Sequence, residues 1–77
     1  MENYEKIWVI DVPVQGDVKI RECESLEDAT RPDLQTQFII RNKNDIARII
    51  GNYEGPRWCD VHAAARGVLR IQGDRQK

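Results

Sequence analysis

Cys59 and His62 are the two residues in this sequence whose types and spacing best suit covalent chemistry. They lie three residues apart in a segment that we expect to be helical, so their side chains would be neighbours on one face. A thiol in the first turn of a helix is activated by the helix dipole, and an imidazole beside it can act as a base. No third group orients the imidazole, so packing is the interpretation we favour. We therefore predict no catalytic residue.

The sequence supports metal and cofactor binding even less than catalysis by the Cys59–His62 pair. Cys23, Cys59 and His62 are the candidate metal ligands, but a structural zinc site usually has four ligands in paired spacing. The five glycines are scattered, so no glycine-rich phosphate loop is present. We predict no metal, no cofactor and a non-enzymatic protein.

The composition is that of a small folded domain. The chain has 77 residues, of which 40% are hydrophobic and 32% charged, so we expect a single domain over 1–77 with a modest core. Its clearest apolar run, Ile7 to Ile10, is too short to cross a bilayer, and the start lacks the features of a secretory signal. We therefore expect a cytoplasmic protein with free thiols and no membrane partner.

The charges are unevenly distributed along the chain. Residues 1–33 contain nine acidic and four basic residues, whereas residues 34–77 contain four acidic and eight basic residues. Arginine outnumbers lysine by eight to four, and its planar fork suits carboxylates, phosphates and interfaces. The two halves either complement each other within the fold or present surfaces of opposite charge to partners.

The first half of the chain predicts a β-hairpin and a third strand. β-Branched and aromatic residues predict a strand over 4–12, with apolar residues of both parities that indicate a central position. Pro13 should end it, and Gly16 suits the reversal into an alternating strand over 18–23 with Lys19 and Arg21 on its polar face. Ser25 could cap a single helical turn, and residues 35–41 read as a strand.

The second half predicts two short helices. Asn42 caps the first, with Asp45 as its capping-box partner. Its apolar stripe consists of Ile46, Ile49, Ile50 and Tyr53.

The second predicted helix begins with Pro56 at its first position, and Gly67 is its natural stop. Asp60 and Arg66 would suit the dipole at its two ends, with Trp58 on its inner face. Residues 68–72 then read as a last strand, although the apolar spacing also fits one longer helix through Gly67. Residues 73–77 read as a flexible tail.

These elements predict an α+β domain in the order β-β-β-α-α-β, with a mostly antiparallel sheet and two short helices on one face. The function we expect is protein–protein interaction, as an accessory, regulatory or inhibitor-type module, and a homodimer through a sheet edge is one form of it. The alternative is a small nucleic-acid-binding regulator using the Arg-rich C-terminal half, although the two helices match only half of a helix-turn-helix pattern. The expected partner-binding residues are charged or aromatic: Glu22, Glu24, Glu27, Asp28, Arg48, Tyr53, Arg57, Trp58 and Arg66.

Overall fold

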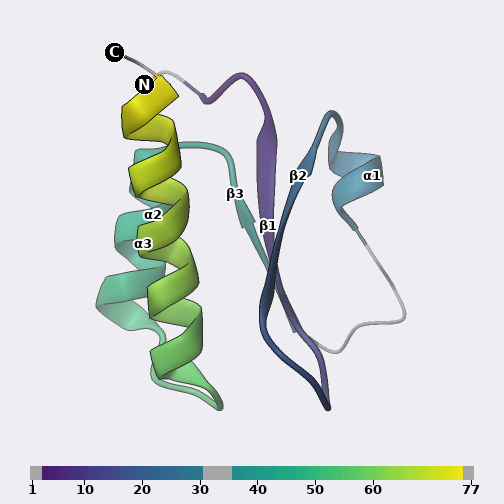
Figure 1. The fold of residues 1–77 in the computed structure, drawn as a ribbon, viewed down its shortest axis with the longest axis vertical. Helices are drawn as coiled ribbons and strands as arrows, with labels where there is room; N and C mark the ends of the chain where they lie inside the picture. Colours follow the sequence, from purple (N-terminus) through teal and green to yellow (C-terminus); the bar gives the residue numbers. More distant parts are fainter. Residues whose placement is uncertain (1–2, 31–35, 76–77) are drawn as a thin grey trace.

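A computed structural model describes residues 3–30 and 36–75. Within these residues the elements are β1 (Ile7–Val12), β2 (Lys19–Cys23), α1 (Leu26–Ala29), β3 (Thr36–Ile40), α2 (Lys43–Asn52) and α3 (Trp58–Arg75) (Figure 1). The order is therefore β-β-α-β-α-α. The predicted α+β class is confirmed, whereas the predicted C-terminal strand is not present.

The three strands form one antiparallel sheet in the order β2-β1-β3. α2 and α3 lie on one face of this sheet, and the single turn α1 lies on the other (Figure 1). The antiparallel sheet and the placement of two helices on one face are as predicted. The sheet leaves β2 and β3 as edge strands, each paired only with β1 in the part of the chain that the structure describes.

The main core lies between β1 and the two long helices. Trp8, Ile10 and Val12 alternate along β1 and point to the helix face, where they pack with apolar side chains of α2 and α3. Val9 points to the other face and packs with Cys23 and Ala29. β1 is thus buried on both faces, which explains its continuous apolar run and confirms its predicted central position.

The hairpin between β1 and β2 is also confirmed. Its register pairs Ile10 with Ile20 and Asp11 with Lys19. Gly16 in the connecting turn has a φ of 97°, a conformation that residues with a Cβ rarely adopt.

The caps of the first two helices follow the sequence prediction. Ser25 caps α1, where its Oγ accepts a hydrogen bond from the backbone N–H of Asp28 at 3.2 Å. Asn42 caps α2 by accepting from two backbone N–H groups, at 3.0 and 3.2 Å. Asp45 accepts a hydrogen bond from the backbone N–H of Arg41 at 2.8 Å. In a capping box this bond would instead come from the N–H of the cap residue Asn42, one residue later.

α3 differs most from the sequence prediction. It runs without interruption from Trp58 to Arg75, so Gly67 does not end it, Arg66 lies in its middle, and residues 68–72 are helical rather than a strand. The buried stripe Val61, Ala65, Val68 and Gln72 has the spacing of one continuous helix face against the sheet. Burying Val68 is worth roughly 1.5–3 kcal/mol, more than the roughly 1 kcal/mol that a helical glycine costs.

The two ends of α3 also need correction. Pro56 lies in the turn before the helix, because Arg57 follows it with a φ of 59° that no helix can include. Residues 73–75, expected to begin a tail, form the last turn of α3, whereas residues 76 and 77 lie outside the described residues.

Candidate functional site

The structure does not bring Cys59 and His62 together as a reactive pair. Cys59 is exposed on α3, and among the described residues it makes no hydrogen bond with the imidazole. His62 donates instead from Nε2 to the carbonyl oxygen of Tyr53 at 2.8 Å, because that carbonyl can only accept. Its ring also lies edge-on to Trp58, with centroids 5.4 Å apart. The histidine therefore anchors the start of α3 to the end of α2.

The three candidate metal ligands are also separated. Cys23 is buried with Val9 on the face of the sheet opposite α3, so it cannot share a ligand sphere with Cys59 and His62. Residues 3–30 and 36–75 contain no group of three His, Cys, Asp or Glu side chains that could hold a metal ion.

Two of the predicted partner-binding carboxylates form ion pairs within the chain. Glu22 on β2 pairs with Arg75 at the end of α3, and Glu24 pairs with Lys6 at 2.6 Å. The hydrogen bond from Arg75 lowers the pKa of Glu22 below its ordinary value, and the bond from Lys6 does the same for Glu24. The Arg75 guanidinium also lies 5.3 Å from the ring centroid of Trp8. The Glu22 carboxylate thus helps to hold α3 on the sheet through Arg75.

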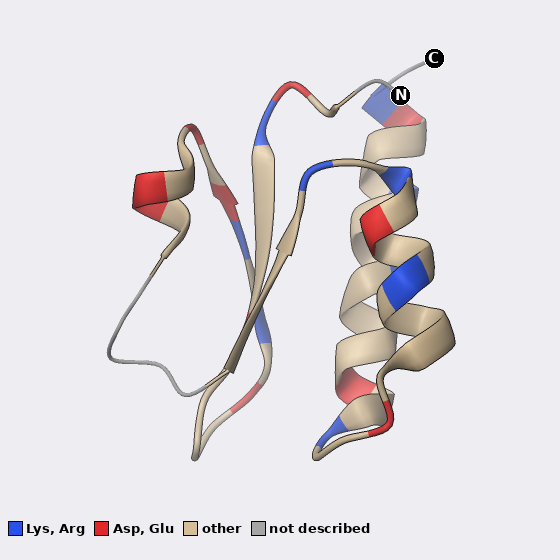
Figure 2. Ribbon diagram, turned by 180° about the vertical axis from the view of Figure 1, so that it is seen from behind, with Lys and Arg blue, Asp and Glu red and all other residues tan. Residues whose placement is uncertain are grey.

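The other two carboxylates remain exposed. Glu27 and Asp28 occupy the first turn of α1, where negative charge suits the N-terminus of a helix. They lie on the face of the sheet opposite α2 and α3 (Figure 2). The acidic segment over 22–28 is therefore divided between ion pairs and one exposed turn.

The three predicted arginines differ in their surroundings. Arg57 donates to the carbonyl oxygen of Gly16, which ties the α2–α3 connection to the β1–β2 turn. Arg48 is 72% exposed and lies 3.7 Å from Asp45, a distance that indicates a weak surface pair. Arg66 is exposed on the middle of α3 and lines a shallow hollow together with Arg70.

The two predicted aromatic anchors also differ. Trp58 is 49% exposed, which corrects its expected place on the inner face of α3 and keeps it available for contact. Tyr53 is half-buried: its ring lies edge-on to Phe38 with centroids 4.7 Å apart, and its hydroxyl donates to the carbonyl oxygen of Pro56 at 2.7 Å. Tyr53, at the end of α2, thus packs this helix against β3.

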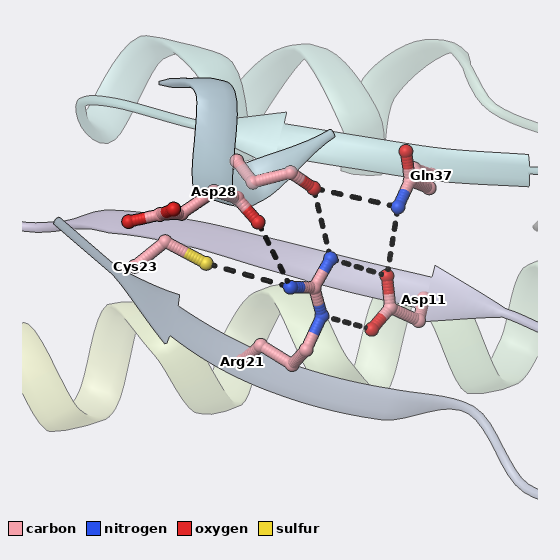
Figure 3. Close-up of polar contacts among 6 residues, drawn as sticks. Asp11, Arg21, Cys23, Asp28 and Gln37 are labelled. Carbon is pink, nitrogen blue, oxygen red and sulfur yellow. Dashed lines mark hydrogen bonds and ion pairs between the residues drawn. The ribbon is translucent and has the colours of Figure 1, made fainter. Parts of the chain in front are cut away.

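A polar cluster that was not predicted from the sequence lies on the α1 face of the sheet (Figure 3). Arg21, expected on the polar face of its strand, forms a two-point ion pair with Asp11, whose exposed fraction is only 6%. The guanidinium also donates to the carbonyl oxygens of Asp28 at 3.4 Å and Ala29 at 2.8 Å, at the end of α1. Gln37 donates to the same carboxylate at 3.3 Å.

This cluster joins all three strands to α1. Arg21 thereby satisfies carbonyl groups at the end of a helix that is too short to be stable alone. The available signal was Asp11, a carboxylate inside an apolar strand, because a buried carboxylate requires a partner.

Among the described residues, one open surface is a groove between β3 and α2. It has a volume of about 330 Å³ and is mainly apolar, with Asp45, Arg48 and Asn52 as its polar members. Its apolar walls are formed by Phe38, Ile39, Ile49 and Tyr53. Successive strand residues point to opposite faces, so a groove lined by both Phe38 and Ile39 includes the edge of β3 itself.

These features define a small α+β protein with a three-stranded antiparallel sheet, one face covered by α2 and α3, and a groove beside β3, an edge strand among the described residues. Comparisons with protein-family models, with curated proteins and with solved structures find no match to this chain. Among the described residues, no helix is long and apolar enough to cross a bilayer.

Proposed function

We propose that this chain is a non-enzymatic protein–protein interaction module that binds an extended segment of a partner protein along β3. The observation that carries the proposal is the groove of about 330 Å³ between this edge strand and α2. A segment added to β3 would hydrogen-bond to the backbone N–H and C=O groups of β3 that point away from β1. It would place one apolar side chain in the groove.

The charges at the rim indicate one further property of the partner segment. Arg48 is largely exposed and only weakly paired with Asp45, so its guanidinium retains donors for a partner carboxylate. We therefore expect an apolar anchor with an acidic residue nearby. The free thiols Cys23 and Cys59 are consistent with the reducing cytoplasm, which we propose as the location.

Nucleic-acid binding is the second candidate, and Arg66 and Arg70 give it a specific basis. They line one shallow hollow of about 270 Å³ on α3, and neither forms an ion pair within the described residues. The support is weaker because Arg75 is paired with Glu22 and Arg57 with a backbone carbonyl, which leaves fewer arginines for a phosphate-binding face.

A matched pair of variants tests the β3 proposal. Ile39→Lys places a charge at the edge of the groove, a device by which edge strands are protected from pairing. Ile71→Lys makes the same change at a 37% exposed position on α3. Capture from cells that produce the protein, after nuclease treatment, should retain one partner with wild type and Ile71→Lys and lose it with Ile39→Lys.

Three results would overturn the proposal. In the first, the Ile39→Lys variant still retains the partner. In the second, binding requires nucleic acid. In the third, no partner protein is captured after nuclease treatment. Sedimentation of the purified chain shows whether it binds a second copy of itself. If the chain forms a dimer that Ile39→Lys dissociates, a homodimer through β3 would replace the proposed binding of a foreign segment.

A further inference from the structure

A second pocket, distinct from the β3 groove, lies where α2 ends and α3 begins. It has a volume of about 330 Å³ and is lined by Ile50, Gly51, Glu54, Trp58 and His62. We propose that this pocket binds a cationic side chain with an apolar stem, an arginine of another molecule in particular. The proposal concerns a different surface from β3 and does not depend on the function proposed above.

The pocket is electrostatically suited to a cation. Glu54 is exposed, and its carboxylate forms no ion pair within residues 3–30 and 36–75. The C-terminal end of α2 carries the negative pole of the helix dipole, and no basic residue lies in its last turn. A cation bound here would therefore interact with a carboxylate that has no ion pair within the described residues and with a helix C-terminus that has no basic residue in its last turn.

Trp58 supplies an aromatic surface for the same cation. Its side chain is 49% exposed, yet it is held from one side by the edge-on contact with His62. His62 is in turn fixed by its hydrogen bond to the carbonyl oxygen of Tyr53. A guanidinium is planar and weakly hydrated, so it stacks on an indole more readily than an ammonium group does.

The remaining lining residues suit the stem of an arginine. Ile50 gives an apolar wall, and Gly51 adds no side chain to the space. Long cationic side chains lay their methylene groups on such surfaces and keep the charged end at the rim.

The basic residue next to Trp58 in the sequence does not fill the pocket. Arg57 precedes Trp58, but it donates to the carbonyl oxygen of Gly16 and does not line the pocket. Asp60 places a carboxylate in the first turn of α3, although it does not line the pocket. Acidic as well as basic residues thus surround the α2–α3 connection (Figure 2).

An NMR titration with two probes of nearly equal shape tests the proposal. N-acetyl-arginine amide carries a guanidinium, whereas N-acetyl-citrulline amide is neutral, and sodium chloride keeps the ionic strength equal. At neutral pH the arginine probe should shift the indole N–H of Trp58 and the backbone amides of Gly51 and Glu54. The citrulline probe should shift the same signals at least roughly fivefold less at equal concentration.

Variants assign the effect to the two groups. Glu54→Gln and Trp58→Leu should each weaken binding of the arginine probe roughly two- to fivefold. Trp58→Phe, which keeps an aromatic ring, should bind more tightly than Trp58→Leu, and Glu27→Gln should match wild type because it removes an exposed carboxylate on α1. Ile39→Lys should also match wild type, which separates this site from the β3 groove.

The proposal fails if citrulline shifts these signals as strongly as arginine. It also fails if the shifts map to another surface, or if Glu54→Gln and Trp58→Leu both bind as wild type does.

Discussion

Replacing Gly67 with alanine tests the continuity of α3 through the sign of one free-energy change. Gly67 lies inside this 18-residue helix, and a Cβ added there would lie 3.6 Å from Cδ1 of Ile20, an ordinary van der Waals distance. Alanine is favoured over glycine in a helix interior by about 0.5–1 kcal/mol. We therefore expect Gly67→Ala to raise the free energy of unfolding by about this amount.

A glycine that ended the helix would give the opposite sign. In a left-handed cap, alanine would be strained and would destabilise the protein by about 1 kcal/mol. Urea denaturation followed by far-UV circular dichroism measures the difference, and the melting temperature should rise by roughly 2–8 °C.

Gly16→Ala is the matched control for this experiment. Gly16 has open space around it but a φ of 97°, so alanine there should lower the free energy of unfolding by about 1 kcal/mol. A loss of stability in Gly67→Ala as large as that in Gly16→Ala would refute the continuous helix.

Three further predictions concern the polar groups of the structure. Asp11→Ala removes a two-point carboxylate partner from the partly buried guanidinium of Arg21 and should cost about 2–4 kcal/mol in urea denaturation; a cost below about 0.5 kcal/mol would contradict the cluster. Arg75 lowers the pKa of Glu22, so stabilisation by this pair is present above the ordinary value of 4.5 and is lost as the pH falls through the lower folded-state pKa. Arg75→Gln should raise that pKa toward 4.5 in an NMR titration of the carboxyl group, and an unchanged value would exclude this cause. Cys59 should be the one thiol that reacts rapidly with Ellman's reagent in the native protein, with the second reacting after unfolding; two rapid thiols would show that the buried cysteine is accessible.

The strands and α2 were predictable because their signals are local. The apolar run of β1, the turn at Gly16 and the cap at Asn42 each specify a conformation within a few residues. α3 was harder because two local signals conflict. Gly67 favours a stop, whereas the spacing of Val61, Ala65 and Val68 favours continuation, and only the sheet face that buries this stripe decides between them.

The surface features were less predictable because they depend on contacts between distant segments. Glu22 and Arg75 are 53 residues apart, so their pairing follows from the path of α3 across the sheet. Residue type alone identified Trp58 as a candidate anchor, but its exposure was predicted wrongly because Trp58 also fits the apolar spacing of the helix. The groove beside β3 required knowing that β3 is an edge strand, which strand order along the chain does not determine.

Tyr53 connects the two proposed surfaces and therefore cannot be used to distinguish them. Its ring packs on Phe38 and lines the β3 groove, whereas its carbonyl oxygen holds His62 at the wall of the α2–α3 pocket. Gly55 allows this arrangement, because a Cβ there would lie 2.8 Å from the tyrosine ring. A substitution at Tyr53 or Gly55 would alter both surfaces together. Glu54 and Ile39 each line only one of the two surfaces, so changes at these positions can separate the two proposed binding activities.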